Sequence, residues 1–218
     1  MPIHAVLFDL DDTLHDKSRT LECVAREQYA MARLSELRVD LSAWVSHFIA
    51  LNNERIEKFL VFSSLAAEFS LPPELASSLL HDFDDHLGSK ACPFPGAREL
   101  LSRCREQGLK TGIVTNGRNA FQRSKITGLG LDTLVDVTVT SGELGIKKPD
   151  LRIFRTCLEA LMVEPAEAAF VGDDFAADME PAIALGMHAV WKSPLSSAKV
   201  AFSSDHLEDI GLHLLGAV

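Results

Sequence analysis

The stretch from residue 6 to residue 14, VLFDLDDTL, constrains the fold of this chain more than any other. Its first three residues form an apolar, β-prone run that is typical of a buried strand in a parallel sheet. Asp9 and Asp11 follow at the carboxyl end of that run, and Thr13 comes two residues later. Because ligands of open α/β sheets bind just outside the carboxyl ends of the strands, the stretch predicts a reactive site at this point.

Two carboxylates at this spacing suit acid–base and nucleophilic chemistry. In an extended segment, residues i and i+2 point the same way and lie about 6–7 Å apart. One carboxylate can attack a substrate while the other transfers a proton. A divalent cation nearby would neutralise their repulsion and favour an anionic substrate. The alternative interpretation is an acidic turn between a strand and a helix, with Asp12 or Thr13 as the helix N-cap.

The second half of the chain alternates between apolar β-prone runs and amphipathic helical segments with short connections. This pattern predicts an α/β fold in which a parallel sheet is covered by helices on both faces. The expected strands are 110–115, 134–139, 168–171 and 188–191, and the expected helices are 97–107, 120–127, 150–161 and 178–185.

Residues 16 to about 85 differ from the rest because they lack β-rich runs and show helical periodicity. We expect a helix over about 21–34, one helix or two in tandem over 41–62 with 63–69 continuing helical, and a helix over 74–87 with a proline near its first turn. The sequence therefore predicts two domains. A Rossmann-like core comprises 1–15 and 88–218, and an all-helical domain, 16–87, is inserted after the first strand.

Composition limits the classes of partner. The formal net charge of −10 argues against duplex nucleic acid or an anionic membrane as the main partner, since both need basic patches.

Four cysteines, at positions 23, 92, 104 and 157, form no C-x-x-C pair, and we expect free thiols in a reducing compartment. We recognise no secretory signal and no apolar run of roughly 18 residues that could span a membrane. We expect a cytoplasmic protein, and its oligomeric state stays open.

Three more of the predicted strands end in residues that suit a phosphate site. Thr115 in TNG offers a hydroxyl and nearby backbone N–H groups. Lys148 in GIKKPD can supply a positive charge, whereas a solvated surface lysine is the alternative that we favour for Lys147. Asp173 in GDDFAAD follows an apolar strand and can hold a hard cation such as Mg²⁺. A common turn is the alternative for Thr115, and helix N-capping is the alternative for the acidic pair Asp173 and Asp174.

Taken together, these segments resemble a known family. DLDDT (9–13), TNG (115–117), KKPD (147–150) and GDDFAAD (172–178) match, in order, the four motifs of the haloacid dehalogenase-like hydrolase superfamily. Most members of that superfamily transfer phosphoryl groups through an aspartyl-phosphate. Many relatives have glycine where this chain has Asp12, a departure that removes no catalytic group.

The resemblance implies a role for each matching residue. Asp9 is the nucleophile, and Asp11 is the acid for the leaving oxygen and then the base for water. Thr115 binds the phosphoryl group, with Asn116 assisting. Lys148 binds substrate as well and balances charge.

The resemblance also implies a Mg²⁺ cofactor. Its ligands would be the Asp9 carboxylate, the Asp11 backbone carbonyl and Asp173. Asp178 would orient a metal-bound water or Lys148. Asp174 stands where serine is common, and its part in metal binding stays open.

The implied activity is hydrolysis of a small phosphorylated metabolite, for example a nucleoside monophosphate or a sugar phosphate. The helical insert resembles the C1 cap that closes over the site and reads the leaving group. A 2-haloacid dehalogenase is an alternative, although the family's dehalogenases lack an aspartate where Asp11 stands. A phosphomutase would need an acid in the cap, which we do not identify. A non-catalytic binding relative is disfavoured because all four motifs are retained.

Overall fold

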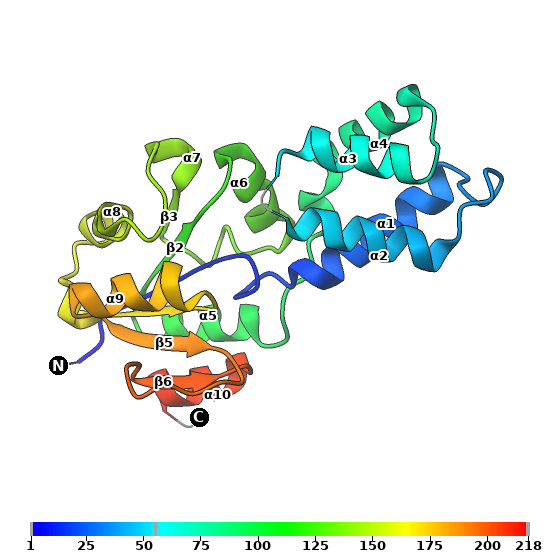
Figure 1. Ribbon diagram of the computed structural model, residues 1–218. Helices are drawn as coiled ribbons and strands as arrows, with labels where there is room; N and C mark the ends of the chain where they lie inside the picture. Colours follow the sequence, from blue (N-terminus) through cyan, green and yellow to red (C-terminus); the bar gives the residue numbers. More distant parts are fainter. Residues whose placement is uncertain (1, 55, 217–218) are drawn as a thin grey trace. The chain divides into compact units, whose positions relative to one another are not determined.

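The computed structural model describes residues 2–54 and 56–216 (Figure 1). The chain divides into two compact units, Met1–Asp16 with Pro93–Val218, and Lys17–Cys92. Compared with the expected domain limits, the first boundary differs by one residue and the second by five. Among the described residues, no helix is both long and apolar enough to cross a membrane. All four cysteines are free.

The first unit is built on a parallel sheet with the strand order β3-β2-β1-β4-β5-β6. Its central strand β1 is buried along its whole length, as its continuous apolar sequence predicts. The strands are β1 (Ala5–Phe8), β2 (Lys110–Thr115), β3 (Val137–Thr140), β4 (Ala168–Gly172), β5 (His188–Lys192) and β6 (Phe202–Ser204).

Helices cover both faces of this sheet, which confirms the predicted α/β class (Figure 1). One face packs against α8 and α9 through a core that includes Leu7, Phe154 and Phe170. Helices α5 and α10 contact each other. In addition, α5 contacts β2 and α10 contacts β5. The helical elements are α5 (Ala97–Glu106), α6 (Asn119–Gly128), α7 (Ser141–Leu144), α8 (Leu151–Leu161), η2 (Pro165–Glu167), the π-helix η3 (Phe175–Met179), α9 (Glu180–Leu185) and α10 (Leu207–Leu215).

The second unit is helical in its described residues. Its core is an aromatic cluster in which Phe48, Phe62 and Phe83 lie with ring centroids 5.6–6.0 Å apart. Trp44 is also fully buried, and its Nε1 donates a hydrogen bond to the carbonyl of Ala25. The elements are α1 (Lys17–Met31), α2 (Leu41–Asn53), α3 (Lys58–Glu68), α4 (Pro73–His86) and the short η1 (Gly88–Lys90).

Several element limits differ from the prediction. The expected helical stretch 41–62 forms two helices, α2 and α3, which was one of the two alternatives for it, and α3 runs on to Glu68. The expected strand 134–139 begins only at Val137. In that segment, the Asp136 side chain accepts a hydrogen bond from the backbone N–H of Thr111 at 2.8 Å. A π-helix precedes α9 where the sequence predicts an uninterrupted helix from residue 178. Strand β6 and helix α10 were not predicted.

Candidate active site

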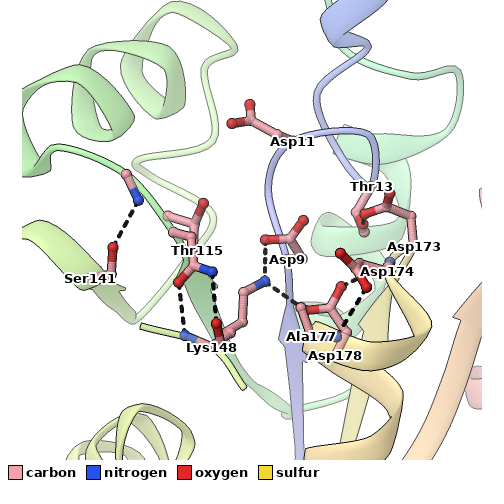
Figure 2. Close-up of polar contacts among 12 residues, drawn as sticks. Asp9, Asp11, Thr13, Thr115, Ser141, Lys148, Asp173, Asp174, Ala177 and Asp178 are labelled. Atoms are coloured by element: carbon pink, nitrogen blue, oxygen red, sulfur yellow. Dashed lines mark hydrogen bonds and ion pairs between the residues drawn. The ribbon is translucent and has the colours of Figure 1, made fainter. Parts of the chain in front are cut away.

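The carboxyl ends of β1, β2 and β4 lie at one edge of the sheet. Phe8 at the end of β1 pairs with Ile113 of β2 and Val171 of β4, so the next residues of all three strands are level. Asp9 is fixed there because its backbone N–H donates to the carbonyl of Val171 at 2.9 Å. The expected meeting of strand ends therefore occurs, and it brings Asp9, Thr115 and Asp173 to the same edge (Figure 2).

Lys148 links two buried carboxylates. Its Nζ lies 2.5 Å from Asp9 Oδ1 and 2.6 Å from Asp178 Oδ1 (Figure 2). Burial alone would lower the pKa of Lys148, but the two carboxylates outweigh it and raise that pKa. Burial raises the pKa of Asp9, and the charge of Lys148 opposes this effect. The lysine is therefore a fixed positive charge beside the expected nucleophile, and not a solvated surface residue.

Asn116 holds the backbone of that lysine. Its side-chain Nδ2 donates to the carbonyl of Lys148 at 3.1 Å, and its Oδ1 accepts from the Lys148 N–H at 2.8 Å. The amide thus joins the end of β2 to the segment that carries the lysine. Both polar ends of Asn116 are engaged in this way, so its expected contact with substrate stays a prediction.

Three carboxylates form a cluster that could hold a cation. One oxygen from each of Asp9, Asp173 and Asp178 lies within 4.8 Å of the others. Burial and the neighbouring carboxylates raise the pKa of Asp173 to about 7, and burial together with Asp9 raises the pKa of Asp178 to about 7 against the effect of Lys148. A hard divalent cation fits this site, because such ions bind carboxylate oxygens. It would also relieve the repulsion among the three carboxylates, which the single positive charge of Lys148 does not fully neutralise.

Two neighbours shape this cluster. A Cβ at Gly172 would collide with the carboxyl group of Asp178, so glycine is needed here for the approach of that side chain. Asp174 caps the π-helix η3, since its Oδ1 accepts from the N–H groups of Ala176 and Ala177, both at 3.0 Å. Helix capping, one of the alternatives considered for this acidic pair, therefore applies to Asp174.

The loop after β1 has an unusual backbone at Asp12. Its φ of 61° is in the left-handed region, which glycine adopts without the steric cost paid by other residues. This explains why the related DGT motif has glycine at that position. The next residue, Thr13, donates to Asp173 Oδ1 at 3.2 Å and so ties the loop to the carboxylate cluster.

Asp11 lies apart from the Asp9–Lys148–Asp178 group (Figure 2). Its Oδ1 is 2.6 Å from His15 Nδ1, and both of its oxygens are 2.7 Å from Lys125 Nζ. Burial alone would raise the pKa of Asp11, but Lys125 and His15 outweigh it and lower that pKa. The side chain that we expect to carry the proton is thus held by two cationic or potentially cationic partners. The metal contact expected of its backbone carbonyl stays a prediction.

Thr115 ends β2 with its side chain buried. Its Oγ1 accepts a hydrogen bond from Gln122 Nε2 at 2.6 Å. The following turn is braced by the first residues of α7, because the Gly117 N–H donates to Ser141 Oγ and the Gly142 N–H donates to the Gly117 carbonyl, both at 2.9 Å. The hydroxyl that we expect to bind a phosphoryl group therefore lies on a rigid support.

Sequence analysis did not identify three residues of this site, His15, Gln122 and Lys125. One signal for the last two was present in the sequence, since they are three residues apart and share one face of the predicted helix. In the structure the buried residues of α6 are Gln122, Lys125 and Ile126, so two of the three are polar. Buried lysine and glutamine side chains need partners, and here the partners are Asp11 and Thr115.

Comparisons with known proteins identify the family of this chain. A family model described as haloacid dehalogenase-like hydrolase matches residues 3–186. A glyceraldehyde 3-phosphate phosphatase of Pyrococcus abyssi is 33% identical over 192 residues, which cover 87% of this chain and 81% of that protein. A phosphoserine phosphatase of Thermus thermophilus is 38% identical over 152 residues, covering 69% of this chain and 57% of that protein.

A solved structure agrees as well. The crystal structure of a haloacid dehalogenase-like phosphatase from Thermococcus onnurineus matches with a TM-score of 0.67 at 26% identity, and the match covers 98% of each chain. The sequence motifs, the parallel sheet and these comparisons lead to one conclusion. The chain belongs to the haloacid dehalogenase-like hydrolase family.

Proposed function

We propose that this protein is a Mg²⁺-dependent phosphatase that hydrolyses a small phosphorylated metabolite through an aspartyl-phosphate on Asp9. One observation carries the proposal. A buried carboxylate, Asp9, lies between a fixed lysine 2.5 Å away and two further carboxylates within 4.8 Å. Such a site attracts a divalent cation and, with it, the dianion of a phosphate ester.

The chain's own side chains divide the work. Lys148 binds Oδ1 of Asp9, and we assign the attack on phosphorus to the other oxygen, Oδ2. Thr115 and the backbone N–H groups of the turn after it would bind the phosphoryl oxygens. Asp11 must take up a proton before it can give one to the leaving oxygen, because Lys125 and His15 favour its carboxylate form. Once it has given that proton away, it takes another from the water that hydrolyses the acyl phosphate. Splitting the displacement into two steps in this way avoids one difficult attack by water.

Magnesium would be held by Asp9, Asp173 and the Asp11 backbone carbonyl, with Asp178 beside them. When bound, the ion supplies positive charge that neutralises the phosphoryl oxygens. The close contact of Asp178 with Lys148 supports its assigned role of orienting that lysine.

The activities of two relatives guide the choice of substrate. The two curated relatives act on glyceraldehyde 3-phosphate and on phosphoserine, which are small phosphate monoesters. We propose a substrate of this size, with a sugar phosphate favoured over a nucleoside monophosphate. The helical unit Lys17–Cys92 would act as the cap that selects it, since it is inserted between Asp9 and Thr115.

The activity is tested by hydrolysis of p-nitrophenyl phosphate with Mg²⁺ and with EDTA, followed by a substrate panel. The panel contains glyceraldehyde 3-phosphate, O-phosphoserine, a hexose phosphate, a nucleoside 5′-monophosphate and a 2-haloacid. We expect Mg²⁺-dependent phosphate release from the small monoesters and no halide release. Halide release without metal, or no phosphate release from any ester, would refute the proposal.

Replacing Asp173 by asparagine should separate metal binding from folding. The change removes one negative charge from the cluster, so the metal-free protein should unfold at a higher temperature than wild type. The apparent Mg²⁺ affinity should fall at least about 10-fold, because even the outer partners of a metal ligand are worth that much. Turnover should recover partly at high Mg²⁺. The measurements are thermal unfolding in EDTA and Mg²⁺ titrations of both stability and activity.

The matched control is Asp132→Asn, the same change at an exposed position of the same unit. It should leave the Mg²⁺ titration unchanged. If Asp173→Asn has the titration of wild type, Asp173 is not a metal ligand.

A further inference from the structure

Gln122 is a buried polar side chain between two parts of the candidate site. Only 1% of it is exposed, and it comes from α6. Its Nε2 lies 2.6 Å from Thr115 Oγ1 and 3.3 Å from Asp11 Oδ2. It therefore contacts both the hydroxyl that we assign to the phosphoryl group and the carboxylate that we assign to proton transfer.

The orientation of the Gln122 amide follows from its partners. Both oxygens of Asp11 accept from Lys125 Nζ at 2.7 Å, and the NH₂ end of Gln122, not its oxygen, faces Oδ2 of the same carboxylate. The NH₂ group has two hydrogens, one for Asp11 and one for Thr115. The hydroxyl of Thr115 must then act as the acceptor in its contact with Gln122.

This contact decides where the hydroxyl hydrogen of Thr115 points. A hydroxyl has one hydrogen and two lone pairs. Because Gln122 donates to one lone pair, the hydrogen is directed elsewhere and can be donated to an anion. We propose that Gln122 is a positioning residue that orients the Thr115 hydroxyl as a hydrogen-bond donor to the phosphoryl group. This inference rests on the proposed function, in which Thr115 binds that group.

The packing around Gln122 also fits a defined place for its side chain beside Thr115. A Cβ at Gly117 would lie 2.9 Å from both Cγ and Cδ of Gln122, closer than real Cβ contacts come. The φ of Gly117 is 147°, which other residues rarely adopt. The glycine of the TNG motif therefore leaves room for the glutamine side chain that holds the threonine of the same motif.

The test measures binding of inorganic phosphate by calorimetry in the presence of Mg²⁺, and turnover of p-nitrophenyl phosphate in parallel. Gln122→Met has a similar length and no donor, and Thr115→Val removes the hydroxyl while keeping its shape. Each should weaken phosphate binding by about 10- to 100-fold, the usual worth of a hydrogen bond to a charged group. Since both remove the same interaction, the double variant should lose little more than Thr115→Val alone.

Gln122→Glu provides a second variant of nearly identical shape. Its carboxylate would accept the hydroxyl hydrogen of Thr115 and turn it away from phosphate, so its loss should equal or exceed that of Gln122→Met. Gln107→Met is the control, because that glutamine is exposed on the same unit and should tolerate the change.

The outcomes separate the inference from the function. Unchanged phosphate affinity in both Gln122 variants, or losses that multiply in the double variant, would overturn the positioning role. A wild-type protein that binds phosphate but hydrolyses no ester would instead refute the proposed function, while the phosphate titrations still decide the role of Gln122.

Discussion

Asp9→Asn is expected to give a folded protein that neither hydrolyses phosphate esters nor acquires a phosphoryl group. An amide oxygen can still accept the hydrogen bond from Lys148, and the loss of one charge eases the repulsion from Asp173 and Asp178. Attack on phosphorus, however, needs the carboxylate. Loss of the nucleophile in other covalent enzymes costs about 10⁶-fold in kcat, so activity should fall below detection.

The measurement is phosphate release together with intact-mass detection of a phosphoryl adduct after rapid quenching. Asp132→Asn again serves as the matched surface control and should behave like wild type. Thermal unfolding in EDTA should show that Asp9→Asn is at least as stable as wild type. Appreciable turnover by a folded Asp9→Asn protein, or a phosphoryl adduct on it, would show that another group is the nucleophile.

The parts of the site that the sequence predicted are those determined by strand ends. Asp9, Thr115 and Asp173 each follow an apolar run, and parallel pairing in register forces the ends of such runs to one edge. That these three residues lie close together can be predicted without knowing how the side chains pack. The same is true of the alternation of strands and helices. The fold class was predictable for the same reason, because it follows from local periodicity and short connections.

The contacts of Asp11 could not be predicted in this way. Whether Gln122 and Lys125 face the site or solvent depends on how α6 sits against the sheet, and its sequence lacks a clear apolar face. His15 is buried by the path of the loop after β1, which includes the left-handed residue Asp12. Strand β6 is only three residues long, and such a short, serine-rich segment gives little periodicity to detect.

The held position of Asp11 has consequences for the two chemical steps. In the structure its carboxylate binds Lys125 and His15, so it must be released, at least in part, to reach a leaving oxygen or a water. Asp11→Asn keeps a side chain of the same size for these partners. Lys125 also retains its contact with the Phe121 ring, with Nζ 5.1 Å from the ring centroid. We therefore expect Asp11→Asn to fold and to differ from Asp9→Asn in chemistry.

Asp11→Asn should accumulate the phosphorylated enzyme with a good leaving group. Loss of a general acid or base typically costs about 10²–10⁴-fold. A sugar alkoxide needs a proton as it departs, whereas p-nitrophenolate hardly does, so the first step with p-nitrophenyl phosphate should survive better than the second. The second step still needs a base to deprotonate water. A rapid-quench time course should show a burst of p-nitrophenol, slow turnover afterwards, and an added phosphoryl mass on the protein.

A comparison of leaving groups completes this test. With a sugar phosphate, Asp11→Asn should show no burst, because the first step then becomes slow as well. Adding Asp9→Asn should abolish both the burst and the adduct with p-nitrophenyl phosphate, which places the phosphoryl group on Asp9. If Asp11→Asn binds p-nitrophenyl phosphate normally but gives neither burst nor adduct, Asp11 acts before the phosphoenzyme forms even with a leaving group that needs no proton. The division of roles between the two aspartates would then be wrong.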